Sequence, residues 1–275
     1  MLHNIDRVFE DSYEELKHNI LRGDRMDYEN ISGETPLFRS DLEISTLLIE
    51  SGVDVNHKNR WGKTPLFGAD CIKSKLLILA GADVNIMDDF GKTPLFSADT
   101  NKSNILIQAG SNVNLQDNRG DTPIFISDYD KTKLLIEEGA NVNILNSRGE
   151  SPLFYSFETY HLLVQAGAIV NQRDTKFGKT ALFYSNLKKT KFLVSHGANI
   201  DILDFKWKAV YDYDLSYEKY SFISKVRASN KIVRCAKMFI SRRQVDRMRC
   251  LPENLFNSKF KNTRFNILGI SKKWQ

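Results

Sequence analysis

Apolar triplets recur at nearly even intervals along the first two hundred residues, and a glycine follows three positions after each. The triplets lie at 47–49, 76–78, 105–107, 134–136, 162–164 and 192–194, and the glycines are Gly52, Gly81, Gly110, Gly139, Gly167 and Gly197. Glycine readily takes the left-handed conformation that the chain adopts just past a helix C-terminus. We therefore expect one helix to end at each of these glycines.

A second repeated feature, a six-residue motif close to Gly-x-Thr-Pro-Leu-Phe, precedes each triplet. It begins at Gly33, Gly62, Gly91, Gly120, Gly149 and Gly178, so the interval is 29 residues every time. Thr or Ser is a good helix N-cap, because its hydroxyl accepts from an unpaired backbone N–H, and Pro suits the first helical position. Each unit is thus expected to hold two short helices, and a fixed period of this length indicates a solenoid.

The segment between each triplet and the next motif is expected to be an extended step followed by a polar turn. A Val-Asn pair marks this step at 55–56, 84–85, 113–114, 142–143 and 170–171, and Ile200-Asp201 replaces it in the sixth unit. The fifth unit reaches Gly167 one residue early and regains the register through an extra residue within 171–177. We expect the loop there to differ in shape from the others.

These residues, with the ending Gly81-Ala82-Asp83-Val84-Asn85, resemble the ankyrin repeat over about residues 1–205. The resemblance implies an all-α ankyrin-repeat solenoid in which each repeat has a helix-turn-helix and a β-hairpin or loop. The six repeats are expected at 33–61, 62–90, 91–119, 120–148, 149–177 and 178–205. The resemblance further implies a non-catalytic module that binds other proteins.

Two departures from the ankyrin pattern stand out. The histidine that usually follows Thr-Pro-Leu is a phenylalanine in all six units, namely Phe38, Phe67, Phe96, Phe125, Phe154 and Phe183. Each unit is also four residues shorter than the usual 33. The loss falls between the two helices, so we expect a first helix of little more than one turn and a ladder of stacked Phe rings in the space that opens.

Residues 1–32 are expected to form an N-terminal capping half-repeat. Ser12 and Glu15 have the spacing of a capping box that opens a helix over 13–22. His18 and Asn19 occupy positions that are apolar in the other second helices. A polar outer face suits a terminal unit, because repeat arrays need such caps to stay in solution.

The residues directly before each motif glycine are candidates for protein binding at the tips of the hairpins or loops. They are Trp61, Phe90, Arg119, Arg148 and Phe177. Exposed aromatic and Arg side chains are enriched among the residues that dominate protein interfaces. Alternatively, these side chains pack on the neighbouring tips and have only a structural role.

Catalytic and metal-binding motifs are not found. Gly-Lys-Thr occurs at 62–64, 91–93 and 178–180, but a phosphate-binding loop needs a further glycine five residues upstream, where His57, Ile86 and Arg173 stand. Asp70, Asp99 and Asp128 also recur, but at 29-residue spacing they form a column along the solenoid and not a pocket. We expect no enzyme, no cofactor and no metal site.

The expected compartment is the cytoplasm, or a host cytoplasm if the protein is a viral or bacterial effector. No stretch approaches the 18 apolar residues of a membrane span, and residues 1–16 lack the apolar core of a signal peptide. The three cysteines, Cys71, Cys235 and Cys250, are odd in number and lack metal-ligand spacing, which favours reduced thiols. We expect a monomer.

The last 70 residues, 206–275, differ in character and are expected to be a C-terminal cap with a basic helical region over about 216–249. They hold 17 Lys and Arg against 5 Asp and Glu, whereas residues 1–205 hold 22 against 29. Such asymmetry suggests an anionic partner, a nucleic acid or an anionic surface. Alternatively, the basic helix docks on the acidic solenoid. The candidate contacts are Arg234, Lys237, Arg242, Arg243, Arg247 and Arg249.

Two functions follow from these patterns. The first is a protein–protein interaction module or adaptor that uses its tips and inner helices. The second is a nucleic-acid-associated or anionic-surface-associated factor that uses the basic region.

Overall fold

The chain divides into two compact units, Met1–Tyr213 and Asp214–Gln275, and the computed structural model describes residues 13–24, 26–231 and 233 of them. The first unit begins with α1 (Tyr13–Leu21), which the sequence predicts over 13–22. In the second unit residues 217–231 are helical, in agreement with the start of the predicted basic helix. Ser12 and the six basic candidates from Arg234 to Arg249 lie outside the described residues.

The second helices of the repeats end as the apolar triplets and glycines predict. They are α2 (Leu42–Glu50), α4 (Cys71–Leu79), α6 (Thr100–Gln108), α7 (Tyr129–Glu137), α9 (Tyr160–Gln165) and α10 (Leu187–Ser195). Gly81 and the other five glycines that follow these helices have positive φ angles.

The recurrent aspartates have a role that was not predicted from the sequence. Asp70, Asp99 and Asp128 are N-caps, and Asp99 Oδ1 accepts from the Lys102 backbone N–H at 2.8 Å.

The first helices have only three or four residues, as the shortened repeat predicts. They are η2 (Pro36–Phe38), α3 (Pro65–Gly68), α5 (Pro94–Ser97), η3 (Pro123–Ile126), α8 (Pro152–Tyr155) and η4 (Ala181–Tyr184), and η5 (Val210–Asp212) follows them. Thr or Ser stands at the N-cap of the first helix in all six repeats, as predicted, but the expected side-chain capping bond is absent. The Phe96 N–H bonds to the Thr93 carbonyl oxygen at 3.0 Å, so the Thr93 hydroxyl is buried without a partner. The same holds for the hydroxyls of Thr35, Thr64, Thr122 and Ser151.

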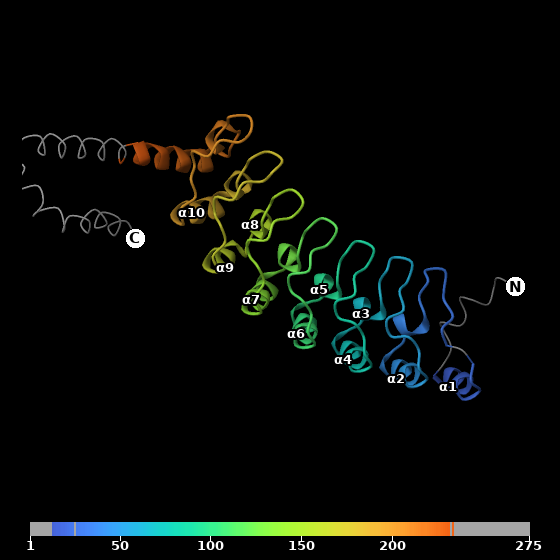
Figure 1. Cartoon of the computed structure of the whole chain (residues 1–275). Coiled ribbons are helices and arrows are strands. Elements are labelled where there is room, and N and C mark those ends of the chain that lie inside the picture. The colour runs from blue at the N-terminus through green and yellow to red at the C-terminus, as the bar shows by residue number, and fades with distance from the viewer. Residues whose placement is uncertain (1–12, 25, 232, 234–275) are drawn as a thin grey trace, which may run out of the picture. The chain divides into compact units, whose positions relative to one another are not determined.

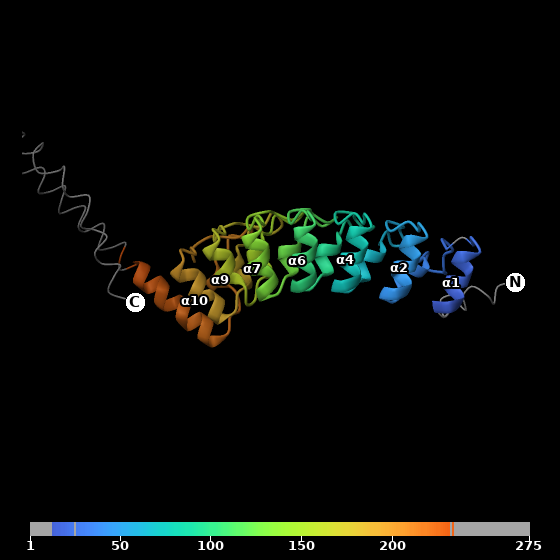
Figure 2. The same cartoon turned by 90° about the horizontal axis from the view of Figure 1, so that it is seen from below.

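The helices of the first unit form two layers, and the loops project beyond the layer of short helices (Figure 1). The second helices lie side by side in one layer, α4 against α6, α6 against α7 and α7 against α9, as both views show (Figures 1 and 2). The short helices form the other layer, with α3 against α5 and η3 between α5 and α8. The described residues contain no β-strand, and the expected hairpins are loops with one isolated bridge, Arg173 to Thr180.

The core between the two layers consists mainly of leucines. Eleven of them are almost completely buried: Leu37, Leu48, Leu66, Leu77, Leu95, Leu106, Leu135, Leu153, Leu163, Leu182 and Leu193.

The predicted Phe ladder is only partly correct. Phe96, Phe125 and Phe154 are buried, whereas the Phe of the first, second and last repeats is half-buried. Three of the Phe rings meet a Tyr of the following repeat and not another Phe, in the pairs Phe125–Tyr155, Phe154–Tyr184 and Phe183–Tyr213.

The Val-Asn pairs do not form extended steps, because each occupies a turn. This turn lets the asparagine bind the next repeat with both ends of its amide. Asn85 Nδ2 donates to the Gly110 carbonyl oxygen at 3.1 Å, and Asn85 Oδ1 accepts from the Asn112 N–H at 2.8 Å. Asn56, Asn114, Asn143 and Asn171 make the equivalent pair of bonds. The asparagines therefore link consecutive repeats.

Four buried lysines make a second set of links between repeats. They are Lys73, Lys102, Lys131 and Lys189, and each Nζ donates to at least one carbonyl oxygen of the preceding repeat, within its short helix or just after it. Lys102 Nζ lies 2.7 Å from the Leu66 oxygen and 2.6 Å from the Ala69 oxygen. A buried ammonium is stable only when it is well hydrogen-bonded, and these carbonyls provide that environment.

Candidate protein-binding surface

The five tip residues lie in loops that a buried Asn or Asp holds in shape. In the second of these loops, Asp88 Oδ1 accepts from the backbone N–H of Phe90 and of Lys92, both at 2.9 Å. Asn59, Asp117 and Asn146 hold the loops of Trp61, Arg119 and Arg148 in the same way. The conformation of each tip is therefore set before any partner binds.

Backbone hydrogen bonds join each tip to the next. The carbonyl oxygen of Trp61 accepts from the Asp89 N–H at 3.0 Å, and that of Phe90 accepts from the Asn118 N–H at 2.9 Å. The carbonyls of Arg119, Arg148 and Phe177 accept in the same way from Ser147, Thr175 and Phe205. The tips thus form one continuous surface, and a partner that contacts several of them does not have to order each loop separately.

The side chains of all five tip residues are exposed. Trp61 is 48% exposed, Phe90 59% and Phe177 43%, and Arg119 and Arg148 are exposed as well. The tips therefore present three large aromatic rings and two guanidinium groups that are partly open to solvent. Figure 1 shows the loops on the side of the short helices that faces away from the layer of second helices.

The fifth loop differs from the others, as its extra residue predicts. Asp174 Oδ1 accepts from the N–H groups of Phe177 and Gly178, three and four positions on, whereas the other loops use the second and fourth positions. Lys179 follows this tip, and its Nζ lies over the rings of Phe177 at 5.7 Å and Tyr213 at 4.1 Å. The C-terminal end of the tip surface is therefore aromatic and cationic.

A second exposed group, on the short helices, was not identified from the sequence. It consists of Ile126, Tyr155 and Tyr184, each at the residue after the motif Phe, with Phe157 nearby. Arg39, Gly68 and Ser97 hold the same position in the first three repeats, so the apolar group is confined to the later repeats. The change from polar or small residues to Ile and Tyr at one repeat position is the signal that could have revealed it.

The hydroxyls of the two exposed tyrosines are tied to carboxylates. The Tyr155 hydroxyl donates to Glu150, and the Tyr184 hydroxyl donates to Asp174 at 3.3 Å. Burial, together with these carboxylates, raises the pKa of both tyrosines above the ordinary value. Both hydroxyls therefore stay protonated at neutral pH, and their rings keep fixed orientations on the surface.

Other chemistry is not evident among the residues that the structure describes. They include no group of three or more His, Cys, Asp or Glu residues with metal-site geometry. None of their helices is long and apolar enough to cross a membrane.

Comparisons with known proteins give a structural match. The ankyrin repeat domain of Bcl-3, a member of the IκB protein family, superposes with a TM-score of 0.56 at 21% sequence identity, covering 76% of this chain and 97% of that domain. No family model and no curated protein matches the sequence.

The protein therefore has the ankyrin-repeat fold, as the repeated motifs predict. Proteins with this fold generally serve as protein–protein interaction modules and are typically not catalysts.

Proposed function

We propose that this protein is a non-catalytic adaptor that captures another protein on the surface formed by its loop tips and short helices. The observation that carries the proposal is the row of exposed Trp, Phe and Arg side chains on loops that are joined to one another by backbone hydrogen bonds. Aromatic and Arg side chains dominate the binding energy of most interfaces. A surface whose loops are already ordered also binds at a lower entropic cost.

The two groups of exposed residues support one extended surface. The tips project from the layer of short helices, on the side that faces away from the second helices, and repeat proteins commonly bind partners along such a surface. Tyr155 joins the two groups, because its hydroxyl accepts from Arg148 Nη1 at 3.4 Å. The proposed partner therefore contacts both groups.

The test is capture of a partner by a variant in which Trp61, Phe90 and Arg119 are replaced together by alanine. We expect capture to be lost while the circular dichroism spectrum and the melting temperature stay nearly unchanged, because these side chains are exposed. The matched control replaces Lys75, Asn104 and Lys133, which are exposed on the second helices, and should leave capture intact. Wild-type capture by the tip variant would refute the proposal.

A second candidate function rests on the charge of residues 206–275, which hold 17 basic against 5 acidic side chains. In this alternative the basic region binds nucleic acid or another anionic surface. Replacement of Arg242, Arg243 and Arg247 by Glu should then abolish capture, and wild-type affinity should fall steeply with salt, because phosphate contacts release counterions. Loss of capture in this variant, with the tip variant unaffected, would favour this second function.

A further inference from the structure

The row of buried lysines is interrupted in the fifth repeat. Lysines occupy the same place in the second, third, fourth and sixth repeats, at 73, 102, 131 and 189. The segment from Phe154 to Leu163 is one residue shorter than that from Phe125 to Leu135. As a result α9 has six residues where α7 has nine, and Thr159 precedes it without making a side-chain capping bond. The lysine and the Asp cap are both missing.

The carbonyl groups that this lysine would have bound are still in place. The carbonyls of Ile124 and Ser127 lie 29 residues after those of Leu95 and Ala98, which accept from Lys131 Nζ at 2.7 and 2.6 Å. Among the described residues no ammonium group donates to Ile124 or Ser127. The Ile124 carbonyl oxygen accepts from Ser127 Oγ at 3.1 Å, and the Ser127 carbonyl oxygen accepts from Thr132 Oγ1 at 3.4 Å.

These hydroxyl bonds leave capacity for a further donor. The equivalent Leu153 carbonyl accepts from Ser156 Oγ at 3.1 Å and from Lys189 Nζ at 2.6 Å at the same time. A carbonyl oxygen has two lone pairs and can take both bonds. The fourth repeat therefore presents two carbonyl oxygens that can each take one more donor, at a place where the four repeats that precede a lysine hold an ammonium.

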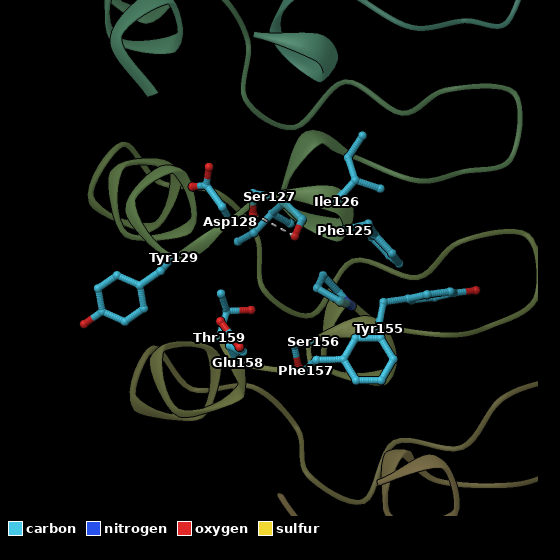
Figure 3. A pocket seen from close by; sticks show the side chains of 12 residues that line it. Phe125, Ile126, Ser127, Asp128, Tyr129, Tyr155, Ser156, Phe157, Glu158 and Thr159 are labelled. Atoms are coloured by element: carbon cyan, nitrogen blue, oxygen red, sulfur yellow. Dashed lines mark hydrogen bonds between the residues drawn. The ribbon is translucent and has the colours of Figure 1, made fainter. Parts of the chain in front are cut away.

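A pocket of about 350 Å³ opens at this place. Ile124, Phe125 and Ser127 line it from the fourth repeat, and Ser156 and Thr159 line it from the fifth. Figure 3 shows Tyr129 at one side of the pocket and the rings of Tyr155 and Phe157 at the other, with Thr159 between them. Aromatic walls suit the alkyl stem of a long cationic side chain and attract its charge.

The charge of the lining also favours a cation. Two carboxylates, Asp128 and Glu158, line the pocket, and no Lys, Arg or His does. Glu158 takes part in no salt bridge within the described part of the chain. At the rim, Phe157 is 75% exposed and Ile126 58% exposed. Large apolar side chains that surround a polar pocket are typical of a protein interface.

We propose that this pocket binds the side-chain ammonium group of a lysine from a partner protein. The ammonium donates to the carbonyl oxygens of Ile124 and Ser127, as Lys131 does one repeat earlier, and the alkyl stem lies against the aromatic walls. Glu158 supplies the neutralising charge. This inference rests on the proposed function, because it assigns one contact within a protein interface.

The direct test is a titration at pH 7 of the full chain with N-acetyl-lysine methylamide, followed by the backbone amide NMR shifts of the pocket residues. A single small group binds weakly, so we expect saturable shifts with a dissociation constant on the order of 1 mM. The norleucine analogue, which lacks the ammonium, should cause no saturable shift. The trimethyl-lysine analogue keeps the charge but has no N–H donor, and it should also fail. Equal shifts with all three compounds would overturn the proposal.

Two variants locate the site. In the first variant, residues 157–159 are replaced by the four residues of positions 99–102, which restores the missing lysine. This variant should no longer show the NMR shifts with the lysine analogue, and its melting temperature should be higher than that of the wild type. Glu158→Gln should weaken binding about two- to fivefold. The matched control, Glu137→Gln on the exposed face of α7, should not change it. Full binding by both pocket variants would overturn the assignment to this site.

A further arm separates a lysine side chain from a free polyamine. Spermidine carries the same group on a longer chain, and we expect it to bind no more than about threefold tighter than the lysine analogue, as its number of ammonium groups suggests. Binding tighter by a factor of a hundred would identify a polyamine as the ligand and overturn the proposal. The two proposals can fail separately. If the wild type binds the lysine analogue saturably but the tip variant still captures the partner, only the proposed tip surface is refuted. If the tip variant loses capture but the wild type does not bind the lysine analogue, only the pocket is refuted.

Discussion

Lys131 Nζ lies 2.6 Å from the carbonyl oxygen of Ala98, a residue of the preceding repeat. The same ammonium also donates to the Leu95 carbonyl at 2.7 Å, and its side chain is only 4% exposed. A cation buried in this way connects two repeats through a charged hydrogen bond. It is expensive to remove, because its acceptors would stay buried without a donor.

Replacing Lys131 by Met should therefore destabilise the first unit by about 2 to 3 kcal/mol, as expected for a buried charged hydrogen bond. The matched control is Lys133→Met, two positions along the same helix. The Lys133 side chain is exposed, and its ion pair is a long one, with Nζ 4.0 Å from Glu137 Oε1. This control should cost less than about 0.5 kcal/mol. Denaturant unfolding measures both, and equal values would show that the Lys131 contacts contribute nothing.

The stability of the wild type should also rise between about pH 8 and about pH 10. Burial lowers the pKa of Lys131 from 10.5 to about 8, although Asp128 opposes the shift. In this range the unfolded chain binds more protons than the folded chain, so the free energy of unfolding increases with pH. The slope should be smaller in Lys131→Met, by at most about 1.4 kcal/mol per pH unit. A variant with the same slope as the wild type would contradict the assignment.

Phe96→Ala should destabilise the protein by about 3 to 5 kcal/mol, because the residue is buried and removal of its ring leaves a cavity. Phe90→Ala, at a loop tip, should cost less than about 1 kcal/mol. Phe96 is 4% exposed and Phe90 59%. Thermal melts of the two variants provide the comparison, and similar melting temperatures would mean that core and tip positions have been confused.

Thr93→Val should leave stability unchanged or raise it by up to about 1 kcal/mol. The Thr93 hydroxyl is buried without a partner, and a methyl group of the same shape removes that penalty. The control is Thr132→Val, because the Thr132 hydroxyl lies 2.6 Å from Ser127 Oγ and is also buried. The control should cost about 1 kcal/mol. A loss at Thr93 as large as that at Thr132 would indicate that the Thr93 hydroxyl does find a partner.

The local elements could be predicted from the sequence because their signals lie within a few residues of one another. The capping motif, the apolar triplets and the glycines after them predict both helices of every repeat, although Ala181 replaces the motif proline in the sixth, and Gly81 shows the expected positive φ. The early Gly167 and the extra residue within 171–177 predict an irregular fifth repeat, but not the loss of the buried lysine from it.

Contacts between repeats could not be derived in this way, because they depend on how the layers pack. Thr93 is a residue type that usually caps a helix, yet the Phe96 N–H bonds to its backbone carbonyl oxygen and not to its hydroxyl. The asparagine links and the Lys131 bonds join residues 24 to 36 positions apart. The pocket beside Thr159 exists because a one-residue deletion shortens α9 while the carbonyls opposite it stay in place. The repeated sequence thus determined the units and their order, and only the packing of one unit on the next decided which polar groups found partners.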